Sequence, residues 1–206
     1  MRHDRLSVLT ALETQGVVPV FYHPDPEVCL NVIRACARGG APVAKEFART
    51  DPDIILGVGS IVDAPTAALF IASAARFIVS PALNPEVARL CNRRMIPYSP
   101  GCGSVTEISY AQELGCEIVK LFPGSSVGGA EFVKAIMGPM PWTKIMPTGG
   151  VDPDAASIAK WFGSGIVAAG MGSKLITGEA IKAKDWSGIE AQVRQTVDAI
   201  AAFRAG

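Results

Sequence analysis

The chain alternates between short apolar runs and longer segments with helical periodicity. The apolar runs predict strands at 17–22, 54–60, 77–81, 96–101, 118–123, 144–149 and 166–172. The segments between them predict helices at 27–38, 64–75, 85–94, 105–114, 129–137 and 153–162, and two further helices, at 4–14 and 188–203, flank the set. Strands and helices that alternate in this way predict an α/β fold with a parallel sheet.

The number of strands predicts a closed barrel. Seven clear strands and a weaker one at 41–43 make eight, the number that closes a (β/α)8 TIM barrel, here with an additional N-terminal helix. A chain of 206 residues suffices for one such domain, so we expect a single domain over 1–206. An open doubly wound sheet is the alternative, but no Gly-x-Gly-x-x-Gly motif follows the first strand.

The second strand-helix unit of this barrel is too short. Residues 41–53 are all that separate Gly39-Gly40 from the strand at 54, whereas a parallel crossover alone needs about a dozen or more residues. We expect a strand at 41–43 that pairs between the first and third strands, then a break in the chain between Val43 and Ala44, and a short helix at about 45–50. Either this second unit is degenerate, or part of it is missing from the sequence.

Composition and charge exclude several classes of function. Lys plus Arg and Asp plus Glu both number 19, so the basic surface of a nucleic-acid-binding protein is not expected. The first five residues lack the apolar core of a signal peptide, and Pro81 and charged residues interrupt the most apolar region, so neither export nor a membrane span is predicted. Five cysteines without Cys-x-x-Cys spacing are typical of reduced thiols in a cytoplasmic protein. With only His3 and His23, a metal site is not expected.

Lys120 lies in the middle of an otherwise apolar strand, Glu117 to Gly124. A desolvated ammonium group loses proton affinity, and the neutral amine is a good nucleophile toward a carbonyl carbon. The position therefore suggests a Schiff-base lysine. The alternative is a lysine at a strand end whose amine reaches solvent.

Two glycine turns follow the last two predicted strands. Gly149-Gly150 comes after the strand at 144–149, and Gly172-Ser173 after the strand at 166–172. Backbone N–H groups in such turns can hold a phosphate, and barrels of this kind often bind phosphate after strands seven and eight. A Gly-Gly pair alone is more often a plain turn.

Other polar residues near the strand ends are weaker candidates. Lys144 opens its strand and should lie at the opposite end of the barrel. Lys174 either leans toward a phosphate or is solvated at a helix start. Tyr22 and His23 end the first strand, and each is either a substrate contact or a polar loop residue.

These motifs together resemble those of the 2-keto-3-deoxy-6-phosphogluconate (KDPG) and 4-hydroxy-2-oxoglutarate (KHG) aldolases, which are class I enzymes with the (β/α)8 fold. The resemblance covers nearly the whole chain. It rests on Val17-Val18-Pro19-Val20, Gly39-Gly40, Gly57-Val58-Gly59-Ser60, Phe77-Ile78-Val79-Ser80-Pro81, Pro100-Gly101, Val119-Lys120-Leu121-Phe122-Pro123, Pro147-Thr148-Gly149-Gly150 and Gly172-Ser173.

The resemblance implies a lyase that splits a 2-keto acid such as KDPG into pyruvate and glyceraldehyde 3-phosphate. It implies Lys120 as the Schiff-base residue, with no metal or organic cofactor, and a homotrimer as the assembly. It also assigns the remaining residues to the substrate carboxylate (Gly101), the rest of the substrate (Ser60 and Thr148) and the phosphate group (Gly149, Gly150 and Ser173, beside Gly172). Ser60 stands where the family usually has Thr, which keeps the hydroxyl group.

The departure from the family falls in the short second unit. Family members follow the Gly-Gly pair with a strand that ends in Glu-x-x-x-Arg, in which the glutamate is the general acid/base. Here Glu46 and Arg49 are three residues apart, and their surroundings favour the last turns of a helix. We therefore expect the acid/base glutamate to be absent, with Glu46 a weak candidate. Two other functions stay open: a different phosphate-binding barrel enzyme, such as an isomerase or synthase, and a non-catalytic sugar-phosphate binder.

Overall fold

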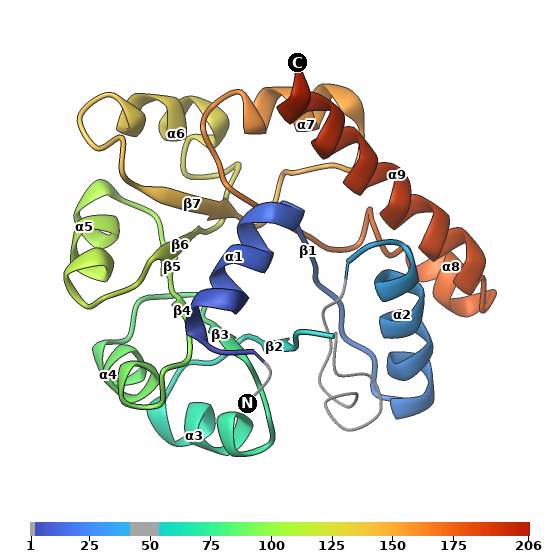
Figure 1. Cartoon of the computed structure of the whole chain (residues 1–206), viewed down its shortest axis with the longest axis horizontal. Helices are drawn as coiled ribbons and strands as arrows, with labels where there is room; N and C mark the ends of the chain where they lie inside the picture. The colour runs from blue at the N-terminus through green and yellow to red at the C-terminus, as the bar shows by residue number, and fades with distance from the viewer. Residues whose placement is uncertain (1–2, 42–53) are drawn as a thin grey trace.

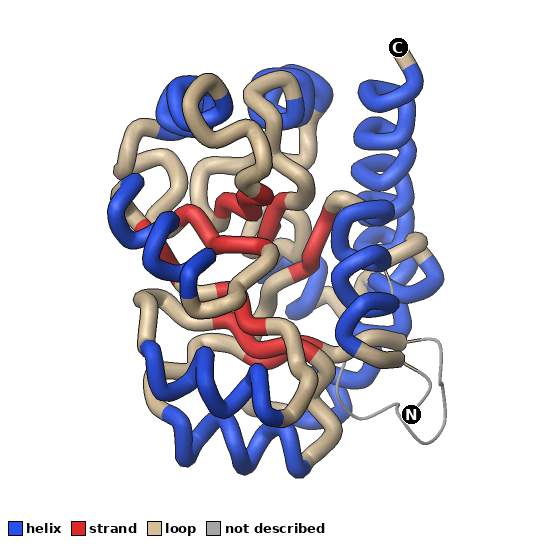
Figure 2. The backbone as a smooth tube through the Cα atoms, turned by 60° about the vertical axis from the view of Figure 1, so that its left-hand side comes forward, coloured by secondary structure: helices blue, strands red, loops and turns tan. Residues whose placement is uncertain are grey.

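The computed structural model describes residues 3–41 and 54–206. Its short strands lie at the centre and its helices around them (Figures 1 and 2). The strands are β1 (Val17–Pro19), β2 (Gly57–Val58), β3 (Phe77–Val79), β4 (Tyr98–Ser99), β5 (Gly101–Cys102), β6 (Ile118–Leu121), β7 (Lys144–Pro147) and β8 (Ala169–Met171). Every pair among them is parallel, as predicted.

The strands follow one another around the barrel in chain order. They pair as β2-β3-β4, β5-β6-β7 and β8-β1, and a bridge between Thr148 and Gly170 connects β7 to β8. β4 and β5 are the two halves of the strand predicted at 96–101, divided at Pro100, which has no N–H group for a ladder bond. The order therefore runs from β2 to β8 and back to β1, the arrangement of a TIM-barrel-like α/β fold.

The predicted second strand at 41–43, the helix at 45–50 and Glu46 with Arg49 fall within residues 41–50. Apart from Ala41, these positions lie outside the described residues. Ala41 follows the second helix, and its N–H group donates to the carbonyl of Cys36 at 2.8 Å.

The helices confirm the periodic pattern. They are α1 (Arg5–Gln15), α2 (Pro26–Arg38), α3 (Ala64–Ala72), α4 (Pro85–Arg93), α5 (Val105–Glu113), α6 (Gly129–Met137), α7 (Ala155–Phe162), α8 (Gly178–Lys182) and α9 (Trp186–Ala205). Their ends lie within three residues of the predicted ones, while α8 was not predicted. Most begin at a short polar residue whose side chain accepts a backbone N–H bond, for example Asp63 before α3 and Asn84 before α4.

Two groups of apolar side chains make the core. The larger fills the space between the strands and the surrounding helices. The smaller lies inside the barrel, where Ile118 and Met146 meet Val8, Leu9 and Leu12 of α1. α1 crosses one end of the barrel in Figure 1 and so closes it with its own apolar face. That end is the N-terminal end of the strands, because Lys144 at the start of β7 pairs with Glu13 of α1 at 2.7 Å.

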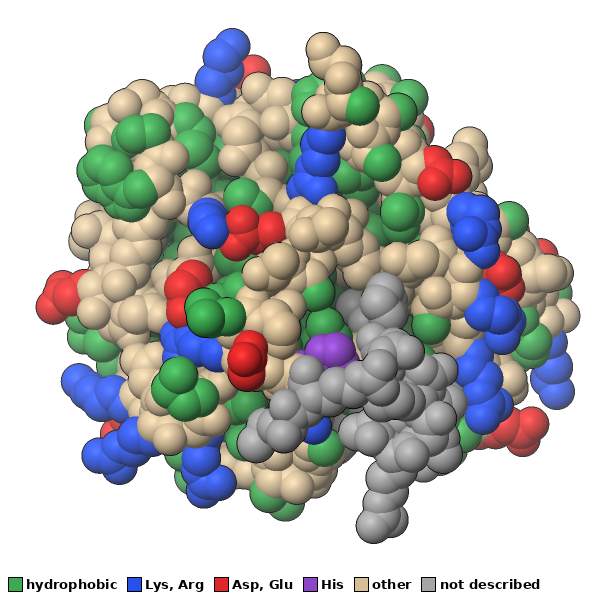
Figure 3. Space-filling model, in the orientation of Figure 1, with side chains coloured by type: hydrophobic (Ala, Val, Ile, Leu, Met, Phe, Trp, Pro, Cys, Tyr) green, Lys and Arg blue, Asp and Glu red, His purple; other side chains and the backbone are tan. Residues whose placement is uncertain are grey.

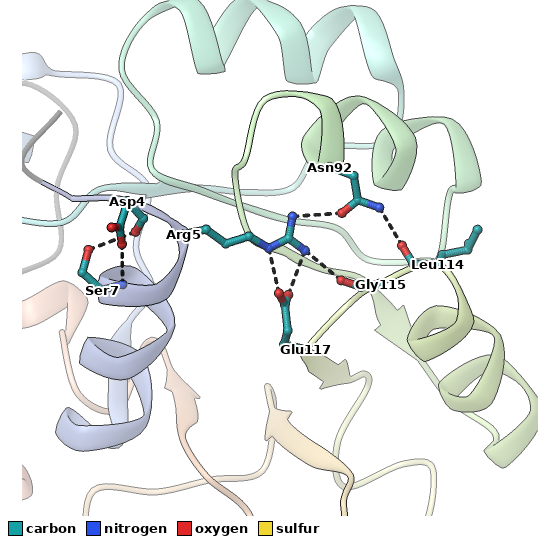
Figure 4. A network of polar contacts seen from close by, with 7 residues as sticks. All are labelled: Asp4, Arg5, Ser7, Asn92, Leu114, Gly115 and Glu117. Atoms are coloured by element: carbon teal, nitrogen blue, oxygen red, sulfur yellow. Dashed lines mark hydrogen bonds and ion pairs between the residues drawn. The ribbon is translucent and has the colours of Figure 1, made fainter.

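Arg5 fastens α1 to this end of the molecule (Figure 4). Its guanidinium group donates two bonds to the carboxylate of Glu117, at 2.7 and 2.9 Å. It also donates to the side-chain oxygen of Asn92 at 2.9 Å and to the carbonyl of Gly115 at 2.8 Å. The N-terminal helix is thereby tied to α4 and to the turn between α5 and β6.

The surface mixes charges of both signs. On the face shown in Figure 3, basic and acidic side chains are interspersed with apolar ones. In the part of the chain that the structure describes, no helix has the length and apolar character needed to cross a membrane.

Candidate active site

A cavity of about 1220 Å³ opens between β1, β2 and the strands β6 to β8. Lys120 of β6, Thr148 after β7 and Ser60 after β2 all line it. Three of the residues predicted from the sequence, contributed by three separate strand ends, therefore face one space. Parallel strands produce this convergence because their carboxyl ends meet at the same side of the barrel.

Lys120 is held inside the barrel by strand alternation. Ile118 belongs to the interior cluster, and Val119 and Leu121 belong to the outer one, so the side chain of Lys120 points inward. Only 6% of the residue is exposed, and burial lowers the pKa of its amine from the ordinary value of 10.5. Its Nζ atom lies 4.0 Å from the centroid of the Phe122 ring. The site thus holds an amine in surroundings that favour the neutral, nucleophilic form.

The hydroxyl group of Thr148 occupies space that a glycine leaves open. A Cβ atom on Gly170 would lie 2.5 Å from Oγ1 of Thr148, so any larger residue there would displace the threonine. Gly170 lines the same cavity. β7 and β8 together place a hydroxyl group on the wall that also carries Lys120.

The remaining polar wall of the cavity includes Ser60, Ser73, Tyr22 and His23. Nδ1 of His23 accepts a bond from the N–H group of Asp25 at 3.1 Å, which anchors the ring to the loop after β1. Neither aspartate nor glutamate is found among the described residues that line the cavity. A carboxylate that could act as acid/base next to Lys120 is therefore not supplied by residues 3–41 or 54–206.

Gly101 lies beside Lys120 in the sheet but is not part of the cavity wall described above. It is the register partner of Lys120 in the β5–β6 pair. A Cβ atom here would lie 2.0 Å from the carbonyl oxygen of Pro81, so only glycine fits against that backbone. The packing alone therefore accounts for glycine at this position, and the substrate contact predicted for Gly101 stays a prediction.

The predicted phosphate turns adjoin the cavity. Gly149 and Gly150 follow Thr148 directly, and both are in the left-handed region, at φ of 92° and 84°. The turn is held in place from two sides. The N–H group of Ser125 donates to the carbonyl of Gly149 at 3.2 Å, and the indole Nε1 of Trp161 donates to the carbonyl of Gly150 at 2.9 Å. Both glycines are exposed and available to a ligand.

The second predicted turn follows β8. Its carbonyl at Gly172 accepts N–H bonds from Leu175 and Ile176, at 2.9 and 3.0 Å, and Ser173 is exposed at its tip. Because β7 and β8 are neighbours, this turn and Gly149-Gly150 leave the barrel side by side. The structure therefore brings the four predicted phosphate residues to adjacent strand ends, next to Thr148 and Gly170 of the cavity.

Comparison with known proteins decides the family. The sequence model of the KDPG and KHG aldolase family matches residues 11–192. The chain belongs to this aldolase family. It is accordingly an enzyme of the lyase class. The predicted family, fold class and enzyme class are confirmed.

Two relatives match over nearly their full length. A 2-dehydro-3-deoxy-phosphogluconate aldolase of Haemophilus influenzae is 28% identical, over 97% of this chain and 100% of its own. That of Treponema pallidum is 30% identical, over 95% and 98%. Among solved structures, a KDPG aldolase from Legionella pneumophila superposes with a TM-score of 0.84 at 26% identity, covering 95% of this chain and 99% of that one. Its crystals captured pyruvate as a covalent carbinolamine intermediate.

Sequence reasoning missed two residues that shape this site. Phe122 follows Lys120 by two positions, directly after the end of β6, and that spacing along an extended chain could have indicated its contact with the amine. Gly170 makes room for Thr148, and a glycine inside an apolar strand is a recognised signal of close approach.

Proposed function

We propose that this family member is a class I aldolase that cleaves KDPG, or a related 4-hydroxy-2-keto acid, through a Schiff base on Lys120. The products are pyruvate and an aldehyde, which is glyceraldehyde 3-phosphate when the substrate is KDPG. The observation that carries the proposal is the buried amine of Lys120, with its lowered pKa, on the wall of a cavity at the strand ends. The covalent pyruvate of the Legionella relative supports the same chemistry.

The reaction follows from a neutral amine at this position. Lys120 attacks the C2 carbonyl, and loss of water from the carbinolamine gives a protonated imine. A base then removes the proton of the C4 hydroxyl group, the C3–C4 bond breaks, and its electron pair moves into the imine to form an enamine. The aldehyde leaves at this stage. Protonation of the enamine at C3 and hydrolysis of the imine release pyruvate and restore Lys120.

The other predicted residues hold the substrate in this scheme. Ser60 and Thr148 line the cavity with hydroxyl groups and are proposed to bind the polar groups of the keto acid chain. Gly101 is proposed to donate its backbone N–H to the carboxylate. The phosphate of KDPG would lie against the turns at Gly149-Gly150 and Gly172-Ser173, where backbone N–H groups suit an anion.

A second candidate function rests on the absence of a carboxylate from the described wall of the cavity. Without an acid/base group, the protein would bind pyruvate as an imine and turn over poorly, and it would act as a sugar-phosphate binder. Glu46, outside the described residues, is the weak candidate for the missing group.

Turnover of KDPG, followed as pyruvate release, tests the proposal. Lys120→Ala should abolish release, whereas Lys144→Ala should retain it because Lys144 pairs with Glu13 at the opposite end of the barrel. A wild-type chain that forms the imine but releases no aldehyde would favour the second candidate. Full activity in Lys120→Ala would rule out both candidate functions, because each depends on an imine at Lys120.

The phosphate turns make a separate prediction. Ser173→Asp places a negative charge at the exposed tip of the turn after β8. It should therefore weaken the binding of KDPG much more than the binding of non-phosphorylated 4-hydroxy-2-oxoglutarate. A charge-assisted contact of this kind is worth about 1.5–3 kcal/mol, so KM for KDPG should rise by about 10-fold or more. Equal losses on the two substrates would remove the phosphate site from the account.

We further propose a homotrimer located in the cytoplasm. Large apolar side chains are exposed on several elements, among them Leu69, Met95 and Trp142, each at least 65% exposed, and burial against another copy would remove them from water. The mass in solution should then be three times the 21.6 kDa of one chain, and a monomeric mass would contradict the trimer.

A further inference from the structure

An ion pair connects the two phosphate turns. Nζ of Lys174 lies 2.5 Å from Oδ2 of Asp152. Asp152 comes two residues after Gly150, and Lys174 comes directly after Ser173. The pair therefore joins the loop after β7 to the loop after β8, beside the place proposed for the phosphate group.

The two partners differ in how firmly they are held. The side chain of Asp152 is one-third exposed, and its backbone N–H group donates to Oγ of Ser157 at 2.9 Å, which holds the backbone of Asp152 just before α7. The side chain of Lys174 is 67% exposed. The lysine is consequently the mobile partner, since a four-carbon side chain that is mostly in solvent can exchange one oxygen ligand for another.

An exposed ion pair of this kind is weak. Screening by water and the entropy of holding a long side chain reduce its strength, so a stronger anion can displace the carboxylate. A phosphate carries up to two negative charges and three acceptor oxygens. A phosphate between the turns would therefore compete successfully for the ammonium group of Lys174.

Resting on the phosphate site of the proposed function, we infer that Lys174 is the residue that selects phosphorylated substrates and that Asp152 holds and partly neutralises it until such a substrate binds. Lys174 turns from Asp152 to the phosphate oxygens, and the remaining carboxylate opposes phosphate binding. The pair sets how strongly the enzyme prefers phosphorylated over non-phosphorylated keto acids. Because Lys174 acts on the remote end of the substrate, its effect is on KM and not on kcat.

Equilibrium binding of inorganic phosphate to the intact chain tests this directly, by calorimetry at low ionic strength. Lys174→Met should weaken binding by about 10-fold or more, the loss expected for one charge-assisted contact. Asp152→Asn should strengthen binding, because it removes a negative charge and frees the lysine. Lys182→Met makes the same change of charge on the exposed helix α8 and should leave phosphate affinity nearly unchanged.

Steady-state kinetics supply the second readout. Lys174→Met should raise KM for KDPG with little change in kcat and should leave both constants for 4-hydroxy-2-oxoglutarate unchanged. An unchanged phosphate affinity in Lys174→Met, or equal losses on the two substrates, would overturn the inference. If Ser173→Asp is selective against KDPG and Lys174→Met is not, the phosphate site stands and only the role of Lys174 falls. If the wild-type chain does not bind phosphate, both the phosphate site and the role of Lys174 are contradicted.

Discussion

Lys120 places an amine among side chains that are mostly apolar, and this has opposite consequences for folding and for reactivity. Burial lowers its pKa from 10.5, so between the lowered pKa and 10.5 the unfolded chain binds a proton that the folded chain does not. Stability must then rise with pH through that window, because the unfolded state carries more protons there. Below the lowered pKa the folded chain bears the full cost of a buried charge.

Lys120→Met should therefore be more stable than the wild-type chain at neutral pH. The gain in free energy of unfolding should be about 0.5–2 kcal/mol, the usual range for a stabilising substitution, and it should shrink as pH rises toward 10.5. Denaturant unfolding at several pH values measures it. Lys134→Met, on the exposed face of α6, is the control and should show no such pH dependence. A Lys120→Met chain less stable than the wild type at every pH would contradict the account of this site.

The elements that position the site are mostly those that hydrophobic periodicity predicts. The helices begin at their polar caps and the strands follow the apolar runs, because both signals are local. The division of β4 from β5 at Pro100 and the helix α8 were missed. Proline in an apolar run indicates an interruption of the strand, because it has no N–H group for a ladder bond. α8 is five residues long and has no buried residue, so no periodic pattern marks it.

α1 is the element whose attachment can be tested most simply. The side chain of Arg5 is only 11% exposed, and it makes its bonds to Glu117, Asn92 and Gly115 across the N-terminal end of the barrel (Figure 4). Arg5→Met should lower the free energy of unfolding by about 1–3 kcal/mol, because it leaves these acceptors without their donor. Arg5→Lys should recover little of the lost stability, since one ammonium group cannot reproduce the several planar N–H donors of the guanidinium group.

Chemical denaturation of both Arg5 variants is the measurement, and the mid-point of the pH–turnover profile should not move in either. A loss below about 0.5 kcal/mol in Arg5→Met, the range of ordinary surface substitutions, would show that α1 is held by its apolar face alone.

At the scale of the whole molecule, the barrel and its lysine could be predicted, and the complete reaction could not. Lys120 is detectable because a charged residue in an apolar strand breaks the pattern, and Gly149-Gly150 because paired glycines follow a strand. The ion pair between Asp152 and Lys174 joins residues 22 positions apart and depends on β7 and β8 being neighbours, so no local signal reveals it. The described residues place no carboxylate on the cavity wall, and Glu46, the weak candidate for the acid/base group, lies outside them.

The measurement that tests the central claim most directly is reductive trapping. The intact chain is incubated with pyruvate and borohydride, and the modified peptide is located by mass spectrometry. The account predicts one reduced pyruvate per chain, attached at Lys120, and none in Lys120→Ala. An adduct at Lys144 or Lys174, or no adduct in the wild-type chain, would contradict a Schiff base on Lys120.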